Sequence, residues 1–260
     1  MRDFTVPGFG IRSPFGGRRW HPRALFASGA PGALYLPSPA TCFQDAAGTT
    51  PAGDGDPVGY VADLSGNGNP ATQPTSAQRP TLWQDAGGTW HLDFDGVDDW
   101  MDTGVTAVAG KADRFAAVAG DFIPTTRPYN HLLHSGSQAT GGSWGLVTRV
   151  AGVDGLGNHY WGSGYNSGIA ITGADVFSVN LAGEVETYRS ARTDTAVDHA
   201  LPAEVSTGTT YGFKLMSRIS SPAEFGKGKL FGAVILGRAV TATERARLET
   251  YLANISGVTL

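Results

Sequence analysis

Short apolar segments follow one another closely along this chain, and glycine, proline or asparagine soon interrupts each of them. The clearest example is LDFDGVDDW, in which Leu92 and Phe94 alternate with aspartates until Gly96 ends the pattern. Neighbouring side chains of a strand point to opposite faces, so this alternation indicates a strand with one apolar and one solvated face. Closely spaced segments of this kind, without helical periodicity between them, predict a β-sandwich rather than a parallel α/β fold.

The composition agrees with an all-β domain that has many turns. The chain has 260 residues, 41% of them hydrophobic, which is enough to build a core, and its 37 glycines and 15 prolines follow no collagen period.

One helix is expected from Thr241 to about Asn254. Thr241 and Glu244 have capping-box spacing, and Leu248 and Leu252 belong to an apolar stripe that ends before Gly257.

Four separated motifs carry a resemblance to a known family. They are GALYLPSPATCFQDAAGTTPAGDGDPVGYV, ADLSGNGNPATQPTSAQRPTLW, WHLDFDGVDDWMDTG and the C-terminal GKLFGAVILGRAVTATERARLETYLANISGVTL. Together they resemble a LamG-like, concanavalin A-like lectin jelly-roll domain of the bacteriophage tail-fibre or virion surface type. The resemblance covers residues 31–260 and implies an all-β, concanavalin A-like jelly-roll β-sandwich with a short C-terminal α-helix. It specifies the fold better than the function, because one fold hosts many unrelated sites.

Residues 1–30 have a different character, with aromatic residues and arginines scattered among glycine and proline. The segment shows neither helical nor strand periodicity, so it buries little by itself. We interpret it as an extended N-terminal arm that attaches the protein to other virion proteins. A tail wrapped on its own domain is an equal alternative, and an arm that binds nucleic acid is a third one.

Charge and hydropathy limit the expected partners and location. The formal net charge of −4 gives no reason to expect nucleic acid as a partner, and the single cysteine, Cys42, excludes an intramolecular disulfide framework. The N-terminus contains no apolar run typical of a signal peptide, and no stretch is long and apolar enough to span a bilayer. We therefore expect synthesis in the host cytoplasm, no membrane insertion and a final place on the virion surface.

The segment DGLGNHYWGSGYN, residues 154–166, concentrates aromatic and amide side chains among glycines. A flat aromatic face suits a pyranose ring, and planar amides suit its hydroxyl groups. The segment is therefore the candidate glycan-binding loop, and the alternative is that its aromatics close one end of the sandwich. The candidate ligand-binding residues are Asn158, His159, Tyr160, Trp161, Tyr165 and Asn166.

A structural Ca²⁺ ion is a second expectation, since several domains of the resembled fold bind one. Carboxylate and amide oxygens are suitable ligands for calcium, although their spacing here is not that of an EF-hand loop. The alternative is that these side chains cap turns. The candidate metal ligands are Asp63, Asn67, Asp95, Asp98 and Asp99.

Catalytic signatures are sparse. Glu184 and Glu186 have the spacing of two acids on one strand face, but Tyr188 occupies the position of a third acid and Gly183 indicates a turn. The acidic stretch that contains Asp99 is dense enough for a general acid/base pair, yet the resemblance implies a structural turn there. A nucleophilic triad has no support, because no nucleophile elbow occurs and the six histidines are scattered. Zinc is equally unsupported, because the chain has one cysteine and no helix with paired histidines. We expect no catalytic residue.

These observations predict a non-enzymatic virion surface protein, a fibre, spike or decoration subunit of a bacteriophage or phage-like particle. We expect it to bind host cell-surface polysaccharide and to form a homo-oligomer, because many copies make weak binding effective. Two alternatives remain: a purely structural virion subunit that binds no glycan, and a glycan depolymerase.

Overall fold

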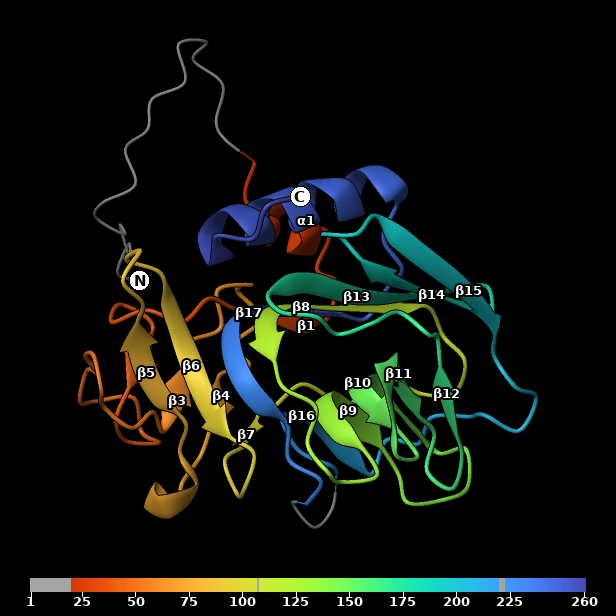
Figure 1. Ribbon diagram of the computed structural model, residues 1–260, viewed down its shortest axis with the longest axis horizontal. Coiled ribbons are helices and arrows are strands. Elements are labelled where there is room, and N and C mark those ends of the chain that lie inside the picture. The colour runs from red at the N-terminus through yellow and green to blue at the C-terminus, as the bar shows by residue number, and fades with distance from the viewer. Residues whose placement is uncertain (1–19, 107, 220–222) are drawn as a thin grey trace, which may run out of the picture.

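The computed structural model describes residues 20–106, 108–219 and 223–260, and in these ranges two antiparallel sheets lie face to face (Figure 1). The all-β prediction is confirmed, and the β-sandwich agrees with the expected jelly roll. The single α-helix of the described residues covers the outer face of one sheet, which we call sheet 1. The other sheet, sheet 2, turns its outer face away from the helix.

Sheet 1 has the strand order β15-β14-β13-β8-β17-β6-β5, and β1 pairs with β17 outside this path. Consecutive strands β13, β14 and β15 form a meander that leaves β15 at the edge of the sheet. The strands are β1 (Gly32–Tyr35), β5 (Thr81–Gln84), β6 (Trp90–Asp95), β8 (Arg114–Phe122), β13 (Asp175–Ala182), β14 (Val185–Ser190), β15 (Thr195–Ala200) and β17 (Lys227–Leu236).

Sheet 2 has the order β12-β11-β10-β9-β16-β7-β4-β3-β2, so its four longest strands lie together and its shortest strands follow at one end. The strands are β2 (Cys42–Phe43), β3 (Tyr60–Val61), β4 (Ala71–Thr72), β7 (Met101–Asp102), β9 (Asn130–Gly136), β10 (Ser143–Val150), β11 (Val153–His159), β12 (Gly164–Asn166) and β16 (Tyr211–Leu215).

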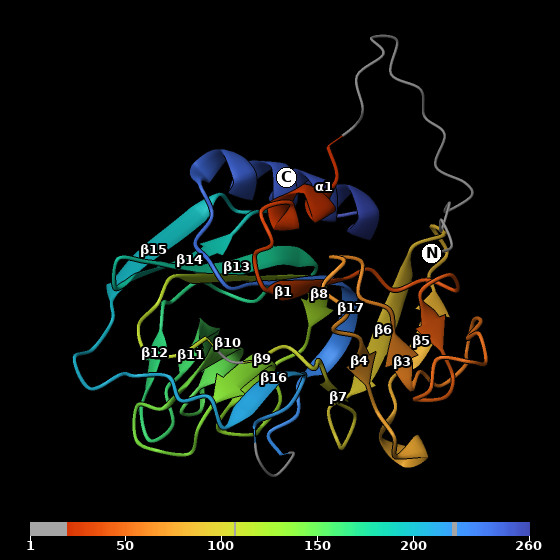
Figure 2. The ribbon, with the colours of Figure 1, turned by 180° about the vertical axis from the view of Figure 1, so that it is seen from behind.

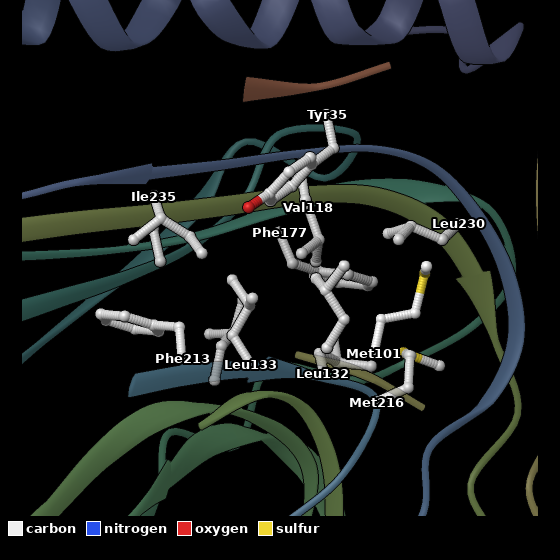
Figure 3. Packing of buried hydrophobic residues seen from close by; sticks show 14 of the residues in the cluster. Tyr35, Met101, Val118, Leu132, Leu133, Phe177, Phe213, Met216, Leu230 and Ile235 are labelled. Atoms are coloured by element: carbon white, nitrogen blue, oxygen red, sulfur yellow. The ribbon is translucent and has the colours of Figure 1, made fainter. Parts of the chain in front are cut away.

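The main core fills the space between the two sheets (Figure 3). Phe177 comes from sheet 1, whereas Leu133 and Phe213 come from sheet 2, and all three are buried. Each such side chain contributes about 1.5 to 3 kcal/mol by leaving water. Tyr35 adds a polar anchor, because its hydroxyl donates to the carbonyl oxygens of Asn69 and Thr103 at 2.7 and 3.0 Å.

A second apolar cluster lies between sheet 1 and the helix α1 (Ala242–Ser256). The helix begins with the expected capping box, in which the Thr241 side chain accepts from the Glu244 amide, and it ends at Gly257 with φ 70°. Leu248 and Leu252 are fully buried in this cluster. The predicted helix is therefore confirmed. Of the described helices, none is long and apolar enough to cross a membrane.

The described chain begins beside α1, where the short 3-10 helix η1 (Pro22–Phe26) lies against it (Figure 2). Leu25 and Phe26 are buried in the helix-covered cluster, and Arg238 donates to the Leu25 carbonyl at 3.1 Å. This part of the 1–30 segment therefore packs on its own domain. Residues 1–19 lie outside the described residues, and the attachment arm stays a prediction. A second short 3-10 helix, η2, spans Ser76–Gln78.

Candidate functional site

The candidate loop 154–166 forms a β-hairpin of β11 and β12, in which Asn158 pairs with Tyr165. Because side chains alternate along a strand, the hairpin sends neighbouring residues to opposite faces of sheet 2. Asn158 and Tyr160 point into the core and are buried, whereas His159 points to the outer face. The residues therefore do not form one ligand surface.

The inward residues of the hairpin meet a carboxylate of sheet 1. Glu186 on β14 is fully buried and accepts hydrogen bonds from Trp144 Nε1 at 2.6 Å and from Asn158 Nδ2 at 2.9 Å. The hydroxyl groups of Tyr160 and Tyr188 also donate to it. Trp144 and Asn158 belong to sheet 2, so this carboxylate joins the two sheets through the core.

Burial raises the pKa of Glu186, although its four hydrogen bonds favour the charged form. Burial and the nearby carboxylate raise the pKa of Tyr160 and that of Tyr188. Glu184 lies elsewhere: its backbone has φ 67°, its side chain is exposed, and it pairs with Lys111 at 3.2 Å. The two glutamates therefore do not face a common cleft, and the enclosed Glu186 is a structural element.

The last two residues of the candidate loop belong to the hairpin edge. Tyr165 is half-buried and stacks on His199 of β15, with ring centroids 3.6 Å apart. Asn166 donates to the Val153 carbonyl at 3.1 Å and accepts from the Gly168 amide at 2.8 Å. Asn166 therefore stabilises the hairpin, whereas Tyr165 contacts sheet 1 across the edge of the sandwich.

The outer face of sheet 2 carries a stack of rings centred on His159. Tyr129 lies 3.9 Å from it and Trp161 lies 5.8 Å from it, both measured between ring centroids and nearly parallel. Burial lowers the pKa of His159 to about 4 and that of His131 and His134 well below the usual range. Trp161 is half-buried and has φ 59°, and with His159 it lies on the outer face of sheet 2.

Three of the candidate metal ligands lie at the end of β6 and in the turn that follows it. Ligand oxygens of Asp95, Asp98 and Asp99 all lie within 4.8 Å of one another. Asp95 Oδ1 accepts from the Val97 amide at 2.7 Å, and Asp99 Oδ2 accepts from the Asp95 amide at 3.1 Å. Gly96 makes this tight turn with φ 76°. The turn therefore brings three carboxyl groups together at the end of a sheet 1 strand.

The pKa of Asp99 is raised to about 7, first by burial and then by the charges of Asp95 and Asp98. The hydrogen bond from the Asp95 amide acts in the opposite direction but is outweighed. At neutral pH the turn therefore holds a proton on Asp99 that can be lost and regained, beside two further carboxyl groups.

The five candidate calcium ligands separate into two groups. Asp63 accepts from the amides of Leu34, Ser65 and Asn69, and Asn67 Nδ2 donates to the carbonyls of residues 30 and 32. These two side chains fix a turn against β1 and do not fit a calcium site. The acidic turn offers carboxyl oxygens, but two of them already accept backbone amides, and calcium takes six to eight oxygens. A calcium ion there stays a prediction.

We expect Asp99→Asn to stabilise the protein above pH 7 and to have little effect at pH 4. The carboxyl group has a higher pKa folded than unfolded, so the folded state binds more protons and this group's contribution to stability falls as pH rises from about 4 to 7. Asparagine removes this loss, with a gain on the order of 2 kcal/mol after allowance for solvent screening. Urea unfolding of both proteins at pH 4 and pH 8 measures this gain. An equal difference in the free energy of unfolding between the two proteins at both pH values would contradict the raised pKa of Asp99.

The comparisons with known proteins identify a fold. No family model matches the chain, and no curated protein matches it significantly. An arabinofuranosidase complexed with arabinofuranosyl-α-1,2-xylobiose is similar, with TM-score 0.64, 10% identity, and coverage of 91% of this chain and 65% of that one. Domain 4 of AbnA, a GH43 extracellular arabinanase from Geobacillus stearothermophilus in complex with arabinotriose, has TM-score 0.52, 13% identity, and coverage of 89% and 99%.

Trypanosoma rangeli sialidase in complex with sialic acid is also similar, with TM-score 0.52, 13% identity, and coverage of 88% of this chain and 33% of that one. The chain therefore spans less than two thirds of the length of the arabinofuranosidase and the sialidase. At such identities the likeness shows the fold alone. It shows a β-sandwich of a kind found in glycosidases and glycan-binding domains.

Two predictions are corrected by these findings. The protein was expected to be a non-enzymatic virion surface protein, but the similar structures described above belong to arabinofuranosidase, arabinanase and sialidase proteins. The expectation that the chain is not an enzyme is overturned by the same structures. The finer resemblance to the LamG-like phage type is not confirmed, because no family model matches. The motifs that suggested it are those of turns and a capped helix, which many sandwiches share.

Proposed function

We propose that this chain is a glycoside hydrolase that acts at the acidic turn, with Asp99 as the proton donor and Asp98 as the second carboxylate. The observation that carries the proposal is the proximity of their carboxyl oxygens, within 4.8 Å of one another. Glycosidases use two carboxyl groups, about 5 Å apart when they retain the anomeric configuration and about 6.5 to 9.5 Å apart when they invert it. The distance here favours retention.

The two carboxyl groups differ in the way that this chemistry requires. Asp99 is largely buried, and its pKa of about 7 keeps a proton available near neutral pH. Asp98 is half-buried, so its carboxylate is open to a substrate. Asp95 is a less suitable partner, because its Oδ1 accepts the amides of Val97 and Asp98 and so fixes the turn.

The proposed reaction has two steps. In the first, Asp99 gives its proton to the glycosidic oxygen, the leaving group departs as an alcohol, and Asp98 forms an ester with the anomeric carbon. In the second, ionised Asp99 takes a proton from water, and the resulting hydroxide displaces Asp98 from that carbon. Both carboxyl groups return to their starting protonation states.

An aromatic and cationic surface adjoins the turn. Trp100 is half-buried, and Lys214 Nζ lies 4.3 Å from its ring centroid while pairing with Asp102 at 3.0 Å. Arg127 donates to the Val97 carbonyl at 3.4 Å. An apolar ring beside charged donors suits the face and the hydroxyl groups of a sugar. We propose that this surface binds the sugar unit whose glycosidic bond is cleaved.

The test is release of sugar from a panel of arabinan, arabinoxylan and sialosides, since the similar structures hold arabinose-containing oligosaccharides or sialic acid. We expect new reducing ends from at least one substrate, with activity that declines as pH rises through about 7, where Asp99 loses its proton. Glu184→Gln is the matched control, because this glutamate is exposed and pairs with Lys111 at the surface. Absence of release from the whole panel between pH 4 and 8 would overturn the proposal.

A further inference from the structure

Three histidines from separate parts of the chain meet on the outer face of sheet 2. His131 and His134 lie on β9, and His159 ends β11. One ring nitrogen from each lies within 4.8 Å of the other two. His131 and His134 are fully buried and His159 is 6% exposed. The backbone carbonyl oxygen of Glu224 lies 3.2 Å from His131 Nδ1. The cluster is separate from the acidic turn proposed above as the catalytic site.

The hydrogen bonds of His131 fix which of its nitrogens is free to bind. Its Nδ1 lies 3.2 Å from the carbonyl oxygen of Glu224, and a carbonyl only accepts, so Nδ1 carries the proton. The lone pair is therefore on Nε2, which lies 3.0 Å from His159 Nδ1. A backbone carbonyl that orients the far nitrogen of an imidazole is a common support for a metal ligand.

We propose that His131 Nε2 and His159 Nδ1, joined by His134, bind a divalent transition metal, with zinc as the preferred ion. Zinc lies about 2.0 to 2.1 Å from histidine nitrogens, so two ligands of a tetrahedral ion are about 3.4 Å apart. The two nitrogens at 3.0 Å need to separate by only a few tenths of an ångström. A set of imidazoles alone suits zinc, copper or nickel and does not suit calcium or magnesium.

His134 is a weaker ligand than the other two. The amide of Ile219 donates to its Nδ1 at 3.2 Å, so the ring proton is on Nε2, which faces the His159 carbonyl at 3.3 Å. For His134 to coordinate, the Ile219 amide has to leave Nδ1. We therefore expect the pair His131 and His159 to set the affinity and His134 to add to it.

Metal binding leaves the imidazoles neutral. Without metal, His159 Nδ1 donates its proton to His131 Nε2. When an ion replaces that proton, His159 carries it on Nε2 instead, so one tautomer replaces another and no proton is released. The rings of Trp161 and Tyr129 stack on His159, and they have to move for the ion to enter.

The test equilibrates the metal-free full chain with Co²⁺ and with Zn²⁺. We expect one equivalent of each, the strong visible absorption of tetrahedral Co²⁺, and its loss on addition of zinc. His131→Gln and His159→Gln should each weaken zinc binding by at least about a hundredfold, and His134→Gln by about tenfold. His199→Gln and Asp98→Asn are controls outside the cluster and should leave the affinity unchanged.

Two results would overturn the proposal. One is a wild-type protein that binds no zinc at micromolar concentration and shows no tetrahedral Co²⁺ spectrum. The other is zinc binding that is lost in Asp98→Asn but kept in His131→Gln, which places the ion at the acidic turn. The first of these results needs only the wild-type protein, so the test remains decisive even where a histidine variant fails to fold.

Discussion

Replacing Glu186 by alanine should lower the free energy of unfolding by about 3 to 5 kcal/mol. The carboxylate accepts hydrogen bonds from Trp144, Asn158, Tyr160 and Tyr188, and all of these groups are buried. Alanine removes the shared acceptor, so the indole and amide donors lose a partner in a place that water does not reach. It also leaves a cavity between the two sheets. Urea unfolding monitored by tryptophan fluorescence measures the loss.

The control for this prediction is two residues away on the same chain segment. Glu184→Ala removes an exposed carboxylate whose ion pair with Lys111 is on the surface, so we expect a change in the free energy of unfolding below about 0.5 kcal/mol. The loss of stability in Glu186→Gln should fall between those of Glu186→Ala and Glu184→Ala, because the amide oxygen still accepts hydrogen bonds while its NH₂ group meets other donors. Equal stability of Glu186→Ala and Glu184→Ala would show that the carboxylate does not hold the sheets together.

The fold was predictable from the sequence because its determinants are local. Alternation at Leu92 and Phe94 does mark a strand, β6, with both side chains buried. Thr241 and Glu244 do form a capping box, and Gly257 does end the helix. Each of these signals is contained within a few neighbouring residues, and no tertiary contact is needed to read it.

The candidate site was only partly predictable, because its geometry depends on contacts between distant segments. The composition of residues 154–166 indicated a loop, but pairing of Asn158 with Tyr165 makes it a hairpin and divides its side chains between two faces. Glu186 reaches Trp144 across 42 residues of sequence. One signal was present: a glutamate at an inward position of an alternating strand, followed by Tyr188 on the same face, is unusual in a core.

The histidine cluster shows the same limit. His131 and His159 are 28 residues apart and no helical spacing relates them, so they form no recognisable metal motif in the sequence. They meet because β9 and β11 both pair with β10 and so lie on either side of it. A metal site built on neighbouring strands has no fixed sequence spacing, since it depends on turn lengths and register.

Asp99→Asn should reduce kcat/KM for a glycoside substrate by about 10² to 10⁴. Asparagine has the shape of the carboxyl group and can still accept from the Asp95 amide, but it has no proton to give to the leaving oxygen. The decline of activity near pH 7 should disappear with the carboxyl group whose pKa is about 7. The same substitution is expected to stabilise the folded protein at pH 8, so loss of activity cannot be attributed to unfolding.

Asp98→Ala distinguishes the two carboxyl groups in the same assay. As the nucleophile, Asp98 should be replaceable by azide, which restores turnover in Asp98→Ala and gives a glycosyl azide. Azide should form no glycosyl azide with Asp99→Asn when the substrate's leaving group needs a proton, because this variant has no acid to supply it. Asp85→Asn is the control, because Asp85 caps a different turn through the amides of Gly87 and Thr89 and is not part of the acidic turn. If Asp99→Asn and Asp85→Asn have equal activity, the acidic turn serves the fold alone, and the proton held beside Asp98 has no part in catalysis.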